Sequence, residues 1–147
     1  MRAPTNTAYH KEQKKFMNRY KAREAAFTLI YQHTFAPSNS LLDMYFDEIE
    51  ERDDLEEDEF IRAILSAFEM NSLDIDELIA ARASGWKLDR LARVTLALLR
   101  LGVCEMKYCD TPKEIAINEI VELAKTYDSD EAPAFINGIL DAIAKEQ

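Results

Sequence analysis

The sequence predicts an all-α protein. Apolar residues recur at helical spacing along most of its 147 residues, and nearly half of all residues are apolar. Three glycines and four prolines are too few for the many tight turns of a sandwich or barrel. At this length roughly 70% of the unfolded surface can be buried. We therefore expect one all-helical domain over residues 14–147, after a flexible N-terminal tail at 1–13 that shows no periodicity.

The first predicted helix begins near Lys14 and ends near Phe35, before Pro37. Four aromatic residues fall within a narrow arc of this helix, and four basic residues spaced by four form an adjacent stripe. The helix therefore offers an aromatic face to the core and a basic edge to solvent. The aromatic residues are Phe16, Tyr20, Phe27 and Tyr31, and the basic residues are Lys11, Lys15, Arg19 and Arg23.

Three helices are expected in the next part of the chain. Ser40 is a good cap for the first of them, and Ser72 for a short one that ends at Gly85. Between these two, the acidic stretch Asp53–Glu59 is expected to fill the first turn of a helix, because carboxylates suit the positive end of the helix dipole.

A long helix that is apolar on most sides is expected to start near Asp89 and to be the central helix. Gly102 inside it costs about 1 kcal/mol relative to alanine, which favours close packing of a neighbour there. "TPKE" at 111–114 supplies a threonine N-cap, a first-position proline and a capping box. With a last helix from about Glu131 to Lys145, the total is about seven helices and no strand.

The charge is unevenly distributed along the chain. Residues 1–25 hold seven Lys/Arg and two Glu, a net of +5, whereas the remaining 122 residues carry a net of −15. Such asymmetry indicates a local site for a polyanion on a body that otherwise repels nucleic acid. The alternative is a solvated arm, or one that lies against the acidic run Asp43–Glu59.

The motifs of common enzymes are missing from the sequence. Neither His10 nor His33 lies three residues after a glutamate, and no glycine-rich phosphate loop or nucleophile elbow occurs. Cys104 and Cys109 lack the further ligands of a zinc site, so they are expected to be free thiols. We expect no enzymatic activity, no metal and no cofactor. Neither a signal peptide nor a transmembrane helix is indicated, which favours the cytoplasm.

Binding is the remaining class of function. Three to five phosphate contacts along one strand would give a salt slope of about −2 to −3.5. Selectivity would then need bases stacked on aromatic rings, for which Tyr31 and Phe135 are the candidates. Each ring has core packing as its alternative role.

Three blocks of sequence resemble the NusB family of bacterial transcription antitermination factors. They are "YKAREAAFTLIYQ" at 20–32, "WKLDRLARVTLALLRLGVCEMKYCDTPKEIAINEIVELAK" at 86–125, and "FINGIL" at 135–140.

The resemblance implies a fold of two small perpendicular helical bundles, with the first helix packing across both. It also implies binding of single-stranded boxA RNA in nascent ribosomal RNA transcripts, together with NusE, a small-subunit ribosomal protein. The assembly would act on RNA polymerase and suppress premature termination. Some relatives dimerise, so a homodimer is a further expectation of the resemblance.

The resemblance also assigns residues. An arginine-rich first helix contacts RNA in the family, and Tyr31 and Phe135 match aromatic positions near the RNA path. Glu131 falls in the segment that faces the partner protein. The RNA-binding set predicted on the first helix is Lys14, Lys15, Arg19, Lys21 and Arg23.

Thr95 and Leu96 depart from the family, which often carries an acidic and then a basic residue there. This departure leaves open what that turn contributes to RNA or partner contact. The main rival function is a helical protein-interaction adaptor without direct RNA binding. It would keep the acidic surface and show no salt-sensitive affinity for RNA.

Overall fold

The computed structural model describes residues 18–83 and 87–146, and these form helices without any strand. The all-α prediction is therefore confirmed. The proposed tail at 1–13 and the helix end at Gly85 lie outside the described residues. The elements are α2 (Arg19–His33), α3 (Leu41–Glu51), α4 (Glu59–Arg82), the 3-10 turn η1 (Leu88–Arg90), α5 (Arg93–Tyr108), α6 (Lys113–Tyr127) and α7 (Ala132–Ala144).

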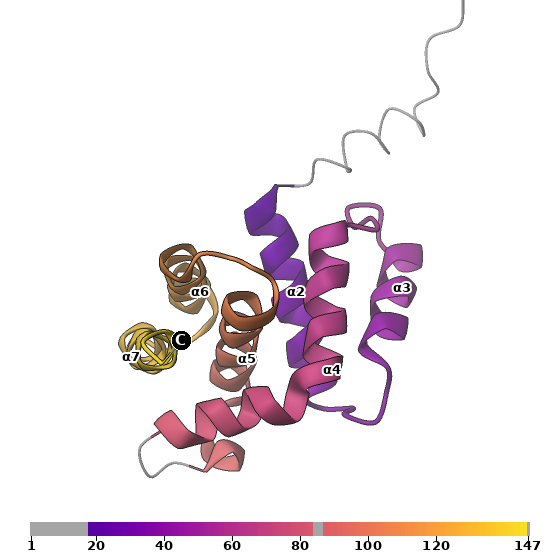
Figure 1. Cartoon of the computed structure of the whole chain (residues 1–147). Helices are drawn as coiled ribbons and strands as arrows, with labels where there is room; N and C mark the ends of the chain where they lie inside the picture. The colour runs from indigo at the N-terminus through magenta and orange to yellow at the C-terminus, as the bar shows by residue number, and fades with distance from the viewer. Residues whose placement is uncertain (1–17, 84–86, 147) are drawn as a thin grey trace, which may run out of the picture.

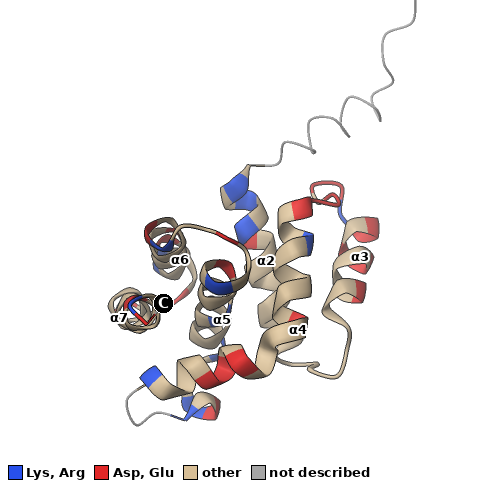
Figure 2. Ribbon diagram, in the orientation of Figure 1, with Lys and Arg blue, Asp and Glu red and all other residues tan. Residues whose placement is uncertain are grey.

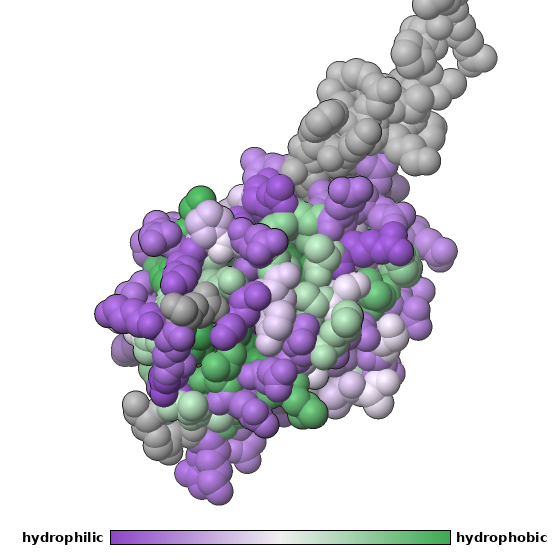
Figure 3. All heavy atoms as spheres, in the orientation of Figure 1, coloured by the Kyte–Doolittle hydropathy of each residue, from purple (hydrophilic) through white to green (hydrophobic). Residues whose placement is uncertain are grey.

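The helices form two groups that meet at α5. Helices α2 and α3 and the first half of α4 lie side by side, whereas α6 and α7 are seen nearly end-on in the same view (Figure 1). Helix α5 packs against α2, α4, α6 and α7 and is the central helix, as the sequence predicted. On the face drawn in Figure 3, hydrophobic side chains show in the middle, over α4 and α5, and hydrophilic ones surround them.

One helix, α4, is found where the sequence predicted two. The chain continues through Ser72 as one helix with a kink at Asn71, whose backbone (φ −127°, ψ 18°) is not helical. The Asn71 side-chain amide donates to the carbonyl of Ala67 at 2.8 Å, which supports the chain at the break. The acidic run lies mostly before this helix, and Asp58 is its cap, accepting from the Ile61 amide at 3.0 Å.

The turn between α5 and α6 also differs from the prediction. Pro112, and not Thr111, is the N-cap of α6, and the Thr111 hydroxyl donates instead to the Glu105 carboxylate at 3.1 Å. Asp110 has a φ of 56°, a left-handed conformation that aspartate tolerates better than most residues. This tight turn brings Thr111 back over the end of α5.

Gly102 allows the close packing that the sequence predicted. A β-carbon placed there would lie 2.8 Å from a methyl of Leu140 on α7 and 3.3 Å from Ile120 on α6. Both of those side chains are fully buried. Helix α5 can therefore approach α6 and α7 together only because this position has no side chain.

Across residues 18–83 and 87–146, no helix combines the length and the apolar character needed to cross a membrane.

Candidate nucleic-acid interface on helix α2

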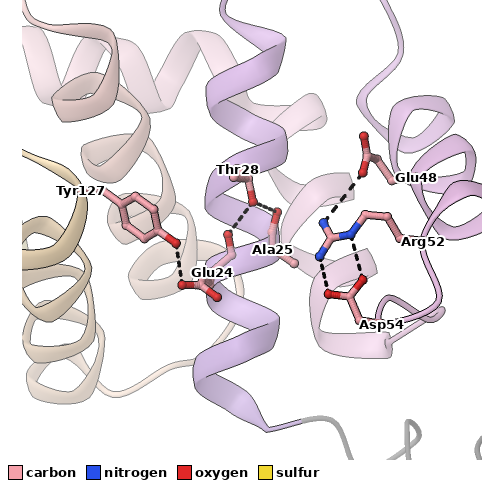
Figure 4. A network of polar contacts seen from close by, with 7 residues as sticks. All are labelled: Glu24, Ala25, Thr28, Glu48, Arg52, Asp54 and Tyr127. Atoms are coloured by element: carbon pink, nitrogen blue, oxygen red, sulfur yellow. Dashed lines mark hydrogen bonds and ion pairs between the residues drawn. The ribbon is translucent and has the colours of Figure 1, made fainter.

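Helix α2 turns one face to the core and the other to solvent. Asn18 caps it by accepting from the Tyr20 amide at 2.8 Å. Ala22, Ala26 and Ile30 are buried at helical spacing. In Figure 4 the opposite face carries Glu24 and Thr28, which lie between Tyr127 of α6 and Arg52 at the end of α3.

Two predicted basic residues are exposed at the start of α2. Both Arg19 and Lys21 face solvent, and Figure 2 shows positive charge gathered at this end of the helix. The Arg19 guanidinium carbon lies 4.0 Å from the centre of the Phe60 ring, a cation–π contact that orients its side chain. Lys14 and Lys15 lie outside the described residues.

Arg23 is not on the predicted basic edge. Its side chain is buried and donates two hydrogen bonds to the Glu105 carboxylate of α5, at 2.7 and 2.8 Å. A Glu119 oxygen lies 3.9 Å from the same guanidinium. The prediction that Arg23 faces solvent is therefore wrong. A buried arginine needs a carboxylate partner, and this partner lies on another helix, where the spacing within α2 could not reveal it.

Aromatic rings continue along the side of α2. The Phe27 ring centre lies 5.1 Å from that of Tyr127 and 6.3 Å from that of Tyr31, and Tyr31 meets Phe35 edge-on at 5.2 Å. Phe27 is buried, Tyr31 is half-buried, and Phe35 and Tyr127 are exposed. Tyr31 thus belongs to a row of rings that runs from the core to the surface.

The row of rings and its neighbours include three residues that the sequence analysis did not propose for binding: Phe35, Tyr127 and Arg93. Arg93, at the first turn of α5, holds its guanidinium carbon 4.8 Å from the Phe35 ring centre. The four-residue spacing from Tyr31 to Phe35 was a usable signal. The contacts of Tyr127 and Arg93 with these rings could not be predicted, because nothing local in the sequence connects these two residues to α2.

Hydrogen bonds tie the α6–α7 connection to this face. The Tyr127 hydroxyl donates to the Glu24 carboxylate at 2.6 Å, and this bond raises the pKa of Tyr127 to about 12. Asp128 accepts from the Thr95 hydroxyl at 2.6 Å. Thr95 and Leu96 are both buried. Both side chains therefore pack in the core, and neither of these two positions carries a charged side chain.

Helix α7 holds the remaining predicted residues. Phe135 is half-buried against the core, and Glu131 is exposed at the N-cap position. Among the described residues, ring contacts join Tyr31 to Phe27 and Phe35 but not to Phe135. The structure therefore does not bring the two predicted rings together.

Negative charge covers the region beside α2. Helix α3 and the loop that follows it are rich in Asp and Glu (Figure 2). Arg52, at the end of α3, donates to Asp54 at 2.8 and 3.0 Å and lies 3.8 Å from Glu48 (Figure 4). Its charge is therefore neutralised locally.

Side chains that bind metals are not grouped in the part of the chain that the structure describes. Cys104 and Cys109 are free thiols, buried and half-buried respectively, as predicted. The Cys104 thiol donates to the carbonyl of Ile64 at 3.4 Å.

Comparison with known proteins decides the family. The model of the NusB family matches residues 20–145. The chain belongs to the NusB family. It is 36% identical over 134 residues to the transcription antitermination protein NusB of Thermoanaerobacter sp., covering 89% of this chain and 93% of the relative. Its identity to NusB of Agathobacter rectalis is 39% over 132 residues, covering 87% of this chain and all of the relative.

Solved NusB structures share the fold. T. maritima NusB superposes with a TM-score of 0.79 at 32% identity, covering 89% of this chain and 93% of that one. A complex of the antitermination factors NusB and NusE with double-stranded RNA gives 0.76 at 28% identity, covering 89% and 100%. The predicted family is confirmed, and the protein is a transcription antitermination factor of a non-enzymatic family.

Proposed function

We propose that this member of the NusB family binds single-stranded boxA-type RNA of nascent ribosomal transcripts, together with NusE, through the exposed face of α2. The observation that carries the proposal is that one helix has exposed cations at its start and a row of aromatic rings farther along it. Arg19 and Lys21 supply positive charge at the start of α2, and Tyr31 lies in the row of rings formed with Phe27 and Phe35. Cations beside rings suit a single strand, whose bases are free to stack. A relative's complex with NusE and RNA supports the partner assignment.

Arg23 has a different role in this proposal. Because its guanidinium is buried against Glu105, it holds α2 to α5 and makes no phosphate contact. Lys14 and Lys15 remain in the proposed RNA-binding set, with Arg19 and Lys21. Phe135 remains a proposed ring near the RNA path, and Glu131 a proposed contact to NusE.

The proposed setting is an antitermination complex on RNA polymerase in the cytoplasm. A homodimer that covers the same face of α2 would be a storage form, and it would dissociate when RNA is added.

Fluorescence anisotropy with a boxA-like oligonucleotide tests the proposal. The titration is repeated over a salt series, with and without NusE. Reversal of both exposed cations, Arg19→Glu with Lys21→Glu, is expected to weaken binding and to reduce the salt slope by about 1.4, because each phosphate contact on a single strand contributes about 0.7. Lys145→Glu, a reversal at an exposed lysine at the end of α7, is the matched control.

The acidic surface over α3 and its following loop favours one rival. A protein adaptor would use this surface to bind a basic partner and would need no RNA contact. Binding to NusE with no salt-sensitive affinity for the oligonucleotide would support the adaptor and reject RNA binding.

A further inference from the structure

We propose that Phe35 and Arg93 form a second base-stacking platform, at the C-terminal end of α2. The inference rests on the proposed RNA binding and extends it to the opposite end of the helix from Arg19 and Lys21. The bound group would be an unpaired base on the Phe35 ring, with its phosphate beside the Arg93 guanidinium.

Phe35 is held in an exposed position. It lies just past the end of α2, and 59% of it is accessible to solvent. The backbone there is fixed by successive turns, in which the amides of Thr34 and Phe35 donate to the carbonyls of Tyr31 and Gln32, each at 3.1 Å. The Thr34 hydroxyl also donates to the Tyr31 carbonyl at 2.6 Å. A ring on a backbone that is already ordered loses less freedom when a base stacks on it.

Two neighbouring side chains, Arg93 and Tyr31, contact the Phe35 ring in a way that suits a nucleotide. The guanidinium carbon of Arg93 lies 4.8 Å from its centre, and Tyr31 touches it edge-on at 5.2 Å. The two rings therefore make one continuous aromatic surface that starts at the predicted RNA-binding tyrosine. Stacking on such rings tolerates any base, and an adjacent arginine adds a cation–π contribution.

Arg93 keeps its charge available. Within the described part of the chain it forms no ion pair with a carboxylate, and its recorded hydrogen bond is a long one, 3.5 Å, to the carbonyl of Thr34. Phe46 on α3 offers the opposite case. It is also exposed and also lies near an arginine, Arg62, but that guanidinium is paired with Glu57 at 2.6 Å. Of these two sites, only that of Phe35 combines an exposed ring with an arginine that no carboxylate among the described residues neutralises.

Phe35→Leu is the decisive variant, because it removes the ring and keeps an apolar side chain. Binding of the boxA-like oligonucleotide is expected to weaken between about 5-fold and about 150-fold, the range for loss of one base–aromatic stack. Phe35→Trp is expected to restore binding. Phe46→Leu is the matched control and should leave the dissociation constant unchanged.

A second measurement separates stacking from a structural effect. Oligonucleotides carrying 2-aminopurine at successive positions report stacking through fluorescence quenching. One position is expected to be quenched by the wild-type protein and by Phe35→Trp, and not by Phe35→Leu. Arg93→Gln should reduce the salt slope by about 0.7.

The outcomes distinguish this inference from the proposed function. If the wild-type protein binds with salt sensitivity and Phe35→Leu binds equally well, the platform is rejected and RNA binding stands. If Phe35→Leu instead loses affinity for NusE alone, the exposed ring is a protein contact and the platform is again rejected. If the wild-type protein does not bind the oligonucleotide, both proposals fail.

Discussion

Replacing Arg23 by alanine should destabilise the protein more than any other single change of a basic residue on α2. The substitution leaves the fully buried Glu105 carboxylate without its two shortest hydrogen bonds, of 2.7 and 2.8 Å. The Thr111 hydroxyl at 3.1 Å would be its remaining side-chain donor. Removing one partner of a buried ion pair costs about 3–5 kcal/mol. For a domain of this size that lowers Tm by roughly 6–20 °C.

Replacing both partners should recover much of this loss. Arg23→Met with Glu105→Leu removes the two charges together and fills the space with apolar side chains, a change that is often neutral or stabilising. Urea denaturation followed by circular dichroism gives the free energy of unfolding of each single variant and of the double variant. A cost below about 1 kcal/mol for Arg23→Ala would refute the reasoning, because the pair would then contribute like a surface ion pair.

The double variant also decides between the two roles of Arg23. If Arg23 only holds α2 to α5, the folded double variant binds RNA with an unchanged salt slope. If Arg23 contacts a phosphate, the slope falls by about 0.7. Anisotropy titrations at four or more salt concentrations measure this difference.

Two further predictions concern stability. The Tyr45 hydroxyl donates to a loop carbonyl at 2.8 Å and accepts from the Asp58 amide at 2.7 Å, so Tyr45→Phe should cost about 1–3 kcal/mol in urea denaturation. Burial raises the pKa of Tyr45 to about 12. Because Tyr45 ionises at a lower pH in the unfolded chain, its contribution to the free energy of unfolding is complete below pH 10 and is lost as the pH rises toward 12. Tyr45→Phe should therefore lose less stability than the wild-type protein between pH 10 and pH 12. Thr95→Val, which removes the hydrogen bond to Asp128, should lower the free energy of unfolding by about 1 kcal/mol, and an unchanged value would contradict it.

Local patterns predicted the fold well because the helices are amphipathic. The core face of α2, the Ser40 cap of α3 and the close packing at Gly102 each follow from neighbours in sequence or from a missing side chain. The errors came where a distant group outweighed a local signal. Thr111 has the sequence of an N-cap, yet its hydroxyl binds Glu105. Ser72 is a residue that often begins a helix, yet α4 continues through it. The kink beside it is stabilised by the hydrogen bond from the Asn71 side chain to the Ala67 carbonyl.

The site was harder to predict because exposure is a property of the whole fold. Arg23 and Arg19 are equivalent by spacing, but one is buried on Glu105 and the other is exposed over Phe60. Arg93 lies 3.5 Å from the Thr34 carbonyl, a residue 59 positions away in sequence. No pattern within one helix contains that information.

The burial of Arg23 changes the expected balance of RNA recognition. On the described part of α2, two exposed cations remain at its start, and Arg93 adds a third near its end. Three phosphate contacts from these residues on a single strand give a salt slope of about −2, and the proposed contacts of Lys14 and Lys15 would bring it to about −3.5. The proposed base stacking on Tyr31 and Phe35 adds affinity that does not depend on salt, so binding should persist at salt concentrations that abolish a purely electrostatic complex. A measured slope steeper than about −3.5 would mean that charge dominates and that the aromatic row is secondary.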